Sequence, residues 1–164
     1  MSGKATPAVD AVRKAGVPHR LLEYDYDPDA DAIGMQAAEA LGVDPACLFK
    51  TLVVQLEGGG LACAVIPSPA RLDLKALAQA AGAKRGAMAD PKEAQRASGY
   101  VVGGISPIGM RRRLPTFIDA SAEGLAEMIV NGGRRGLQIA LAPADLASVT
   151  GGRLLPVTTA GGRP

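Results

Sequence analysis

The sequence predicts a single α+β domain built on a mixed, largely antiparallel β-sheet that is flanked by helices. Segments with strand-like patterns outnumber segments with helical periodicity. Short glycine-rich turns join neighbouring strands, as they do in β-hairpins. The chain of 164 residues is long enough for one hydrophobic core and too short for two domains.

The first part of the chain is predicted to hold a helix, a strand and a second helix. Thr6 followed by Pro7 is a typical helix start, because an N-cap residue precedes proline at the first helical position. A strand is expected over residues 20–26. An alanine-rich helix follows at residues 35–41, and a helical turn at residues 45–48.

The middle of the chain is predicted to begin with a buried hairpin. Residues 50–56 and 61–66 have strand patterns and are separated by a glycine-rich turn. A helix with apolar residues at helical spacing is expected over residues 74–81. A short strand at residues 84–88 and a helix at residues 91–98 complete this part.

The last part is predicted to add a strand at residues 116–119 and a second hairpin, whose strands are residues 127–130 and 137–141. A helix at residues 143–149 and a last strand at residues 154–157 follow.

Neither a repeat nor a linker divides the sequence. Residues 1–157 are therefore expected to form the domain, and residues 158–164 a disordered tail.

Composition sets the protein's broad class. The net charge is only +2, which does not by itself indicate a nucleic-acid partner. The sequence has no apolar signal region and no apolar run long enough to span a membrane. Its two cysteines lie far apart without C-x-x-C spacing. A cytoplasmic protein is therefore expected.

Reactive side chains are scarce. His19 is the one histidine, so a histidine-rich metal site is not expected, nor is a Ser–His–Asp triad. No metal and no cofactor is predicted. A Ser–Lys pair remains open, with Ser106 or Ser68 beside Lys50.

A glycine-rich segment at residues 100–113 is the strongest local signal for a binding site. Gly103 and Gly104 free the backbone, Pro107 restricts it again, and the arginines 111–113 follow. Such a loop can direct several N–H groups toward an anionic or carbonyl-bearing ligand. The alternative is a surface loop with solvated arginines. The segment lacks the Lys-Ser/Thr pair of a P-loop.

Three motifs carry a resemblance to a known family. They are Gly-Gly-Ile-Ser-Pro-Ile-Gly at residues 103–109, Phe-Lys-Thr-Leu at residues 49–52, and Asn-Gly-Gly-Arg-Arg-Gly at residues 131–136. In this order they resemble the YbaK/EbsC family, from about residue 6 to about residue 155. The resemblance implies the fold of aminoacyl-tRNA editing domains, a curled sheet flanked by helices.

The resemblance also implies an activity, the trans-editing hydrolysis of mischarged tRNA. Its expected substrate is Cys-tRNA(Pro), with the substrate's own thiol attacking the ester carbonyl. The expected partners are the acceptor end of tRNA(Pro) and, in a transient complex, prolyl-tRNA synthetase. Two alternatives stay open: a deacylase for another small amino acid such as alanine, and a non-catalytic module that binds acceptor ends or a synthetase.

Site residues are carried over from the family's motifs. Lys50 is expected to contact the terminal adenosine or phosphate of the acceptor end. Gly103 and Gly104 are candidate oxyanion donors, and Ser106 is a candidate for a catalytic hydroxyl. The expected substrate-binding residues are Tyr24, Pro107, Asn131, Gly133 and Gln138. Positive charge around the glycine-rich segments, rather than the family's motifs, gives the expected tRNA-binding residues, which are Arg111, Arg112, Arg113 and Arg134.

Two positions depart from the family's pattern. Asn131 stands where the family has a small polar residue, often serine, and Gln138 stands where it has aspartate. An amide both donates and accepts hydrogen bonds, whereas an ionised carboxylate only accepts them. Any role that rests on negative charge is therefore lost at residue 138, and amino-acid preference is open to change.

Overall fold

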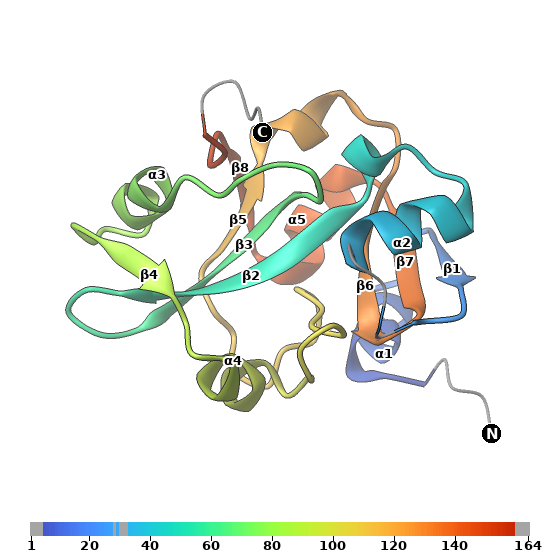
Figure 1. Cartoon of the computed structure of the whole chain (residues 1–164), viewed down its shortest axis with the longest axis horizontal. Helices are drawn as coiled ribbons and strands as arrows, with labels where there is room; N and C mark the ends of the chain where they lie inside the picture. Colours follow the sequence, from blue (N-terminus) through green and yellow to red (C-terminus); the bar gives the residue numbers. More distant parts are fainter. Residues whose placement is uncertain (1–4, 28, 30–32, 160–164) are drawn as a thin grey trace.

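The computed structural model describes residues 5–27, 29 and 33–159, and it has two β-sheets flanked by helices (Figure 1). An antiparallel three-stranded sheet has the order β1 (His19–Glu23), β7 (Leu137–Leu141), β6 (Met128–Arg134). A five-stranded mixed sheet has the order β4 (Gly86–Met88), β2 (Phe49–Leu56), β3 (Leu61–Pro67), β5 (Thr116–Asp119), β8 (Arg153–Leu155). The predicted α+β class is confirmed, but the expected single sheet is divided in two. A parallel bridge between Leu48 and Ile129 links the two sheets.

The helices begin and end largely where local sequence chemistry predicts. They are α1 (Pro7–Ala15), α2 (Ile33–Leu41), α3 (Leu74–Ala80), α4 (Pro91–Ser98) and α5 (Pro143–Thr150), with 3₁₀ turns η1 (Pro45–Cys47) and η2 (Ala120–Gly124). At the start of α1 the Thr6 hydroxyl accepts a hydrogen bond from the Val9 N–H over 3.1 Å. Gly16 ends α1 in the left-handed conformation, which glycine adopts without strain.

The main core lies between the two sheets. Alternate residues of the β2–β3 hairpin, such as Val53 and Val65, share one buried cluster with alternate residues of β6 and β7, such as Val130 and Ile139. Helices α1, α4 and α5 close this core with buried alanine, valine and leucine side chains. Burying apolar surface in this way is the main stabilising term of the fold.

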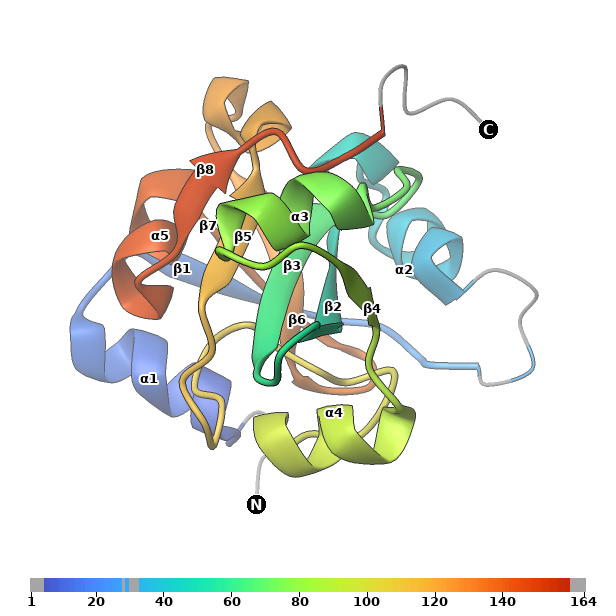
Figure 2. The same ribbon diagram turned by 90° about the vertical axis from the view of Figure 1, so that its left-hand side faces the viewer.

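Two smaller cores lie on the outer faces of the sheets. Helix α3 packs its Leu77 against the far face of the five-stranded sheet, which Figure 2 shows behind that helix. Helix α2 packs Ala37 and Ala38 against Ile129 and Ala140 of the three-stranded sheet. No helix among the described residues is long and apolar enough to cross a membrane.

Three segments differ from the sequence prediction. The first strand ends at Glu23, and the chain continues to residue 27 without ladder pairing. The Asn131-Gly132 pair, which is typical of a hairpin turn, instead lies in β6, where the pairing with β7 shifts register between Asn131 and Arg134. The turn itself falls on residues 135–136. Thr158 pairs with Leu72, so ladder contacts extend past residue 157, and residues 160–164 of the expected tail lie outside the described residues.

Candidate active site

A cavity with a volume of about 380 Å³ lies where the two sheets meet. Its walls come from the first half of β2, from β6 and β7, from the end of β4 and the start of α4, and from the loop around residues 102–105. Five of the predicted site residues line it: Tyr24, Lys50, Gly103, Asn131 and Gln138. Most of the remaining lining is apolar, for example Phe49, Leu52 and Ile105. Residues far apart in the sequence therefore form one site.

Lys50 is the cationic residue of the cavity lining. It stands in β2 opposite Ile66 of β3, and its side chain is half-buried. Burial lowers the pKa of the Lys50 ammonium, because desolvation disfavours the charged form. Among the described residues no carboxylate pairs with Lys50 to offset this cost. A cation held without an internal partner is suited to an anionic or electron-rich ligand.

Replacing Lys50 by methionine is expected to raise the melting temperature by a few degrees. Folding lowers the pKa of Lys50, so the charged side chain is less stable in the folded protein than in the unfolded chain. At any pH below the folded pKa the charged lysine therefore destabilises the folded protein. That penalty fades as the pH rises through the folded pKa, and an apolar side chain of similar length removes it. Thermal unfolding of the two proteins at neutral pH measures the difference. A lower melting temperature for Lys50→Met would contradict the desolvation argument.

Asn131 and Gln138 face each other across β6 and β7. The Asn131 amide makes two hydrogen bonds: its Nδ2 donates to the Gly103 carbonyl over 3.1 Å, and its Oδ1 accepts from the Gly133 N–H over 2.7 Å. Asn131 therefore joins the two glycine-rich segments. Gln138 is only 5% exposed, and its amide makes no hydrogen bond within the described part of the chain. Its donor and acceptor remain for a ligand.

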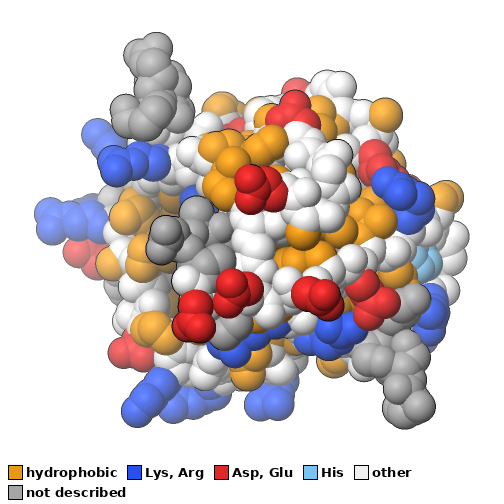
Figure 3. Space-filling view, turned by 45° about the vertical axis from the view of Figure 1, so that its right-hand side comes forward, with side chains coloured by type: hydrophobic (Ala, Val, Ile, Leu, Met, Phe, Trp, Pro, Cys, Tyr) orange, Lys and Arg blue, Asp and Glu red, His pale blue; other side chains and the backbone are white. Residues whose placement is uncertain are grey.

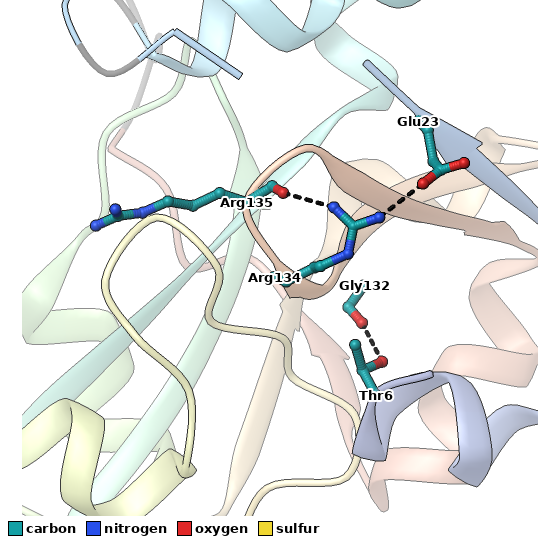
Figure 4. Close-up of polar contacts among 5 residues, drawn as sticks. All are labelled: Thr6, Glu23, Gly132, Arg134 and Arg135. Atoms are coloured by element: carbon teal, nitrogen blue, oxygen red, sulfur yellow. Dashed lines mark hydrogen bonds and ion pairs between the residues drawn. The ribbon is translucent and has the colours of Figure 1, made fainter. Parts of the chain in front are cut away.

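The glycine-rich loop is fixed against the bulge of β6. A Cβ on Gly104 would lie 2.9 Å from the Arg134 Cα, so only glycine permits this contact between two backbones. Arg135 extends toward the loop (Figure 4), and its Nη2 donates to the Val102 carbonyl over 2.8 Å. The Arg135 guanidinium also lies over the ring of Tyr26, 5.4 Å from its centre. The loop is thus held from both sides.

Arg134 stabilises the turn at residues 135–136 that joins β6 to β7. Figure 4 shows its guanidinium between Glu23 and the backbone of Arg135, with hydrogen bonds of 2.6 Å and 2.9 Å. At the other end of the same segment, the Thr6 hydroxyl donates to the Gly132 carbonyl over 2.6 Å. The Glu23 carboxylate pairs with the Arg134 guanidinium. The pair as a whole is neutral, so Arg134 attracts a phosphate less strongly than an unpaired arginine would.

Several predicted site residues do not reach the cavity. The Gly104 N–H donates to the Val101 carbonyl over 2.8 Å, so it is not available as an oxyanion donor in this conformation. Ser106 is fully buried, and its hydroxyl accepts from the Ile108 N–H over 3.2 Å. Pro107 lines a second, smaller cavity of about 200 Å³ instead. In the loop, Gly103 and Ile105 line the main cavity, and their N–H groups have no acceptor among the described residues.

The three consecutive arginines are exposed but have different surroundings. Arg111 lies over Gly99 at the C-terminus of α4, and Arg113 lies against Gly151 at the C-terminus of α5. A cation stabilises a helix C-terminus, so these two have a structural explanation. Arg112 is exposed, and its side chain makes no hydrogen bond or ion pair with the described residues.

Charges of both signs share the surface near the site. Figure 3 shows acidic side chains in a row across one face, with basic side chains below them. From the end of β1 onward the side chains alternate in exposure. The acidic residues Glu23, Asp25 and Asp27 are exposed, and Tyr24 and Tyr26 between them are half-buried. Burial raises the pKa of Tyr24 further above neutral pH, so its hydroxyl is protonated and can donate a hydrogen bond.

The described residues offer no conventional nucleophile and base in the cavity. His19 lies in β1, where its Nδ1 is 2.9 Å from the Val17 carbonyl. Cys63 is fully buried in β3, and burial raises the pKa of its thiol to about 12. Ser68 lines the cavity, yet no hydrogen bond joins it to Lys50. No group of three metal-ligating side chains is found among the residues described.

Replacing either cysteine by alanine is expected to leave the rate of ester hydrolysis per folded molecule nearly unchanged. Cys47 does not line the cavity, and the Cys63 thiol is too basic to be a nucleophile at neutral pH. Cys63→Ala removes a buried sulfur and should lower stability by about 1 kcal/mol. Turnover and thermal unfolding measured together separate the two effects. A strong loss of turnover in a variant that melts normally would restore a cysteine mechanism.

Comparison with known proteins gives the site a context. Residues 27–149 match the aminoacyl-tRNA editing domain family. Over 155 residues the chain is 39% identical to a protein of Enterococcus faecalis named "Putative Cys-tRNA(Pro)/Cys-tRNA(Cys) deacylase EbsC", covering 94% of this chain and 93% of that protein. These matches cover the strands and loops that build the cavity.

Solved structures show the same fold. One, described as a "putative trans-editing enzyme for prolyl tRNA synthetase", has a TM-score of 0.83 at 24% identity and covers 97% of this chain and 99% of its own. Another, "hypothetical protein APE2540", has a TM-score of 0.83 at 26% identity and covers 94% and 100%.

Fold and sequence together define the class of the protein: it is an aminoacyl-tRNA deacylase, an enzyme that hydrolyses the ester between an amino acid and tRNA. The chain belongs to the aminoacyl-tRNA editing domain family, which confirms its resemblance to the YbaK/EbsC group.

The sequence prediction passed over three residues that the structure places at the site. Tyr26 and Arg135 support the loop that carries Gly103, and Thr51 lines the cavity with a buried hydroxyl. Alternation along the segment after β1 could have shown that Tyr26 faces inward together with Tyr24. No local signal distinguishes Arg135 from Arg134, because the direction of each side chain depends on the bulge in β6.

Proposed function

We propose that this enzyme hydrolyses Cys-tRNA(Pro) in trans, with the thiol of the substrate as the attacking group. One observation carries the proposal: the cavity holds a cation, amides and loop N–H groups but no paired nucleophile and base among its described residues. Such a site can position an ester and stabilise negative charge on it. The reaction therefore needs a nucleophile from the substrate, and a cysteinyl ester contains one.

In the proposed reaction the substrate sulfur, after losing its proton, attacks the carbonyl carbon of its own ester. A tetrahedral oxyanion forms, and its collapse breaks the bond to the ribose oxygen, which takes up a proton. The product is the free tRNA end and a strained cyclic thioester of cysteine. Water then opens this ring and yields cysteine. An intramolecular attack avoids the entropy cost of bringing two molecules together, and this gain offsets part of the strain of the four-membered ring. The enzyme then contributes by positioning the ester and stabilising the oxyanion.

The residues of the cavity have separate roles in this scheme. Lys50 binds the phosphate or the adenosine of the acceptor end as a positive charge. The Gly103 N–H has no acceptor among the described residues and donates to the oxyanion. Asn131 positions Gly103 by donating a hydrogen bond to the Gly103 carbonyl. Gln138 and Tyr24 bound the space for the amino acid. Because Gly104 uses its N–H within the loop, the Ile105 N–H takes its place as the second candidate donor.

The partner in this proposal is the acceptor end of tRNA(Pro), and recognition of the tRNA body is assigned to a transient complex with prolyl-tRNA synthetase. The description of the structural relative as a trans-editing enzyme for that synthetase supports this. The chain has 164 residues and a small net charge, so it can cover only a small part of a tRNA.

Binding of tRNA is expected to weaken as salt is added, with a shallow slope. Each phosphate contact releases counterions, and only a few contacts are expected at an acceptor end. Arg112→Ala should lower the affinity at low salt more than Arg71→Ala, which removes an exposed arginine just before α3. Titrations at several salt concentrations measure both. An affinity that does not change with salt would contradict binding through phosphates.

A panel of mischarged tRNAs tests the substrate. Cys-tRNA(Pro) should be hydrolysed fastest. The measured quantity is the rate at which each amino acid is released from its tRNA. Preference for Ala-tRNA(Pro) would favour the alternative of a deacylase for another small amino acid. That alternative is open because Gln138 stands where the family has aspartate. Binding of acceptor ends without hydrolysis of any ester would instead support the non-catalytic module.

A further inference from the structure

The outer edge of strand β2 is open at one residue, Thr51. Backbone hydrogen bonds show which residues point to which edge: the Leu48 carbonyl accepts from Ser68 on the β3 side, whereas the Val53 carbonyl accepts from Ala89 on the opposite side. Because successive residues of a strand alternate between its edges, Thr51 points to the same outer edge as Val53. Val65, its partner in β3, therefore does not share a ladder hydrogen bond with it.

Both ends of this outer edge are covered, and the middle is not. Strand β4 and Ala89 pair with β2 from Val53 onward. At the other end, the bridge between Leu48 and Ile129 brings β6 against the same strand. Figure 1 shows β2 running between β4 and β6 in this way. The main cavity occupies the gap, since its lining includes Ala89, Asn131 and the whole of residues 49–53.

Thr51 consequently has backbone groups on this edge that no β-ladder or bridge of the described residues pairs, because the pairing with β4 begins at Val54 and the bridge to β6 lies at Leu48. By the alternation along β2 its N–H and C=O point into the gap. Its side-chain Oγ1 is buried and makes no hydrogen bond. Buried polar groups are nearly always satisfied in folded proteins, and each exception calls for an explanation. A ligand that supplies one acceptor and one donor side by side would satisfy the open strand edge, much as an added strand does.

The chemistry around Thr51 selects between the groups of an aminoacyl-adenosine. The ammonium group of the amino acid carries only donors and has the same charge as the nearby Lys50, so it does not match. The Watson–Crick edge of adenine carries the acceptor N1 next to the donor N6. The base is also flat and largely apolar, which fits walls formed by Phe49, Val53 and Ile105.

We infer that the open edge of β2 at Thr51 pairs with the 3′-terminal adenine of the tRNA. The Thr51 N–H donates to N1, and the N6 amino group donates to the Thr51 carbonyl. This inference rests on the proposed function, because it takes the acceptor end of a tRNA as the ligand. It makes Thr51 a specificity residue that acts through its backbone.

Analogues of the substrate test the pairing. The probe is adenosine that carries cysteine through a 3′-amide, which is not hydrolysed as an ester. Its binding is compared with the same amide of inosine, of 1-deazaadenosine and of 7-deazaadenosine by calorimetry. The inosine analogue reverses donor and acceptor and should bind about 10- to 100-fold more weakly. The 1-deaza analogue should also weaken, whereas the 7-deaza analogue should bind like adenosine.

Two variants connect these results to the strand edge. Thr51→Pro removes the N–H, which makes no ladder bond, so an edge proline is compatible with the sheet and should abolish the discrimination between adenosine and inosine. Thr51→Val is the matched control, since it keeps the backbone groups and should keep the discrimination. If Thr51→Pro does not fold, the analogue series alone decides.

The outcomes separate this inference from the proposed function. Hydrolysis of Cys-tRNA(Pro) together with equal affinities for the adenosine and inosine analogues would overturn the inference and leave the proposed function standing. Loss of affinity with 7-deazaadenosine alone would also overturn it, because the base would then bind through its other edge. Absence of both hydrolysis and analogue binding would overturn the two together.

Discussion

Lys50→Ala is expected to lower kcat/KM for the hydrolysis of Cys-tRNA(Pro) by about 100- to 1000-fold, the usual cost of removing one well-placed electrostatic contact from an active site. Lys50 is half-buried in the cavity lining and has no internal counter-ion among the described residues, so its charge is available to the substrate. Other lining residues that carry hydrogen-bonding groups, such as Gln138 and Asn131, are neutral and cannot replace it. The measurement is the initial rate of deacylation at several tRNA concentrations.

Lys75→Ala is the matched control for this prediction. Lys75 is an exposed lysine of α3, on the far side of the five-stranded sheet from the main core, and it does not line the cavity. Its removal changes the net charge by the same amount and should leave the rate within about twofold. If Lys50→Ala keeps most of its activity while it melts like the parent protein, the anchoring role of Lys50 is wrong.

Much of the fold follows from local sequence chemistry. The helix starts at Thr6, Asp73 and Asp90 were predictable because each cap is a bond between a side chain and an N–H two or three residues later. The buried hairpin of β2 and β3 was predictable from two apolar runs around a glycine-rich turn. In both cases the determining contacts lie within a short stretch of sequence.

Division into two sheets was not predictable, because it depends on distant contacts. The bridge between the sheets pairs Leu48, which directly precedes β2, with Ile129 of β6, and nothing in either segment identifies its partner. Asn131 illustrates the same limit. Its dipeptide with glycine favours a hairpin turn, yet here its side chain accepts from the Gly133 N–H and stabilises a bulge inside β6.

The candidate site was predictable only in part. Lys50, Gln138 and Gly103, which were carried over from the family's motifs, line one cavity, and their roles remain predictions. Ser106 and Pro107 were expected beside them, but the loop folds back so that the Ser106 hydroxyl accepts from its own turn. Which side of a loop faces a cavity depends on what packs against it, here the backbone of Arg134.

The second large effect expected is on the choice of substrate, because the nucleophile of the proposed reaction belongs to the amino acid. Cysteinyl-tRNA(Pro) is expected to be hydrolysed at least about 100-fold faster than seryl-tRNA(Pro), although the two side chains differ by one atom. A thiol with a pKa near 8.5 is a few per cent thiolate at neutral pH, and the thiolate is intrinsically very nucleophilic. A hydroxyl is almost never ionised there, and the described cavity residues include no histidine that could act as its base.

A third substrate separates recognition from chemistry. S-methylated cysteinyl-tRNA(Pro) keeps the sulfur but cannot form a thiolate, so it should bind and not react. Inhibition of the normal reaction by this analogue would measure its binding. The inhibition constant shows whether the cavity, which in this proposal also takes the terminal adenine, admits the added methyl group. Comparable hydrolysis of all three esters would rule out attack by the substrate thiol, and would require a water molecule activated within the cavity, with Ser68 and Lys50 as the nearest candidates to replace next.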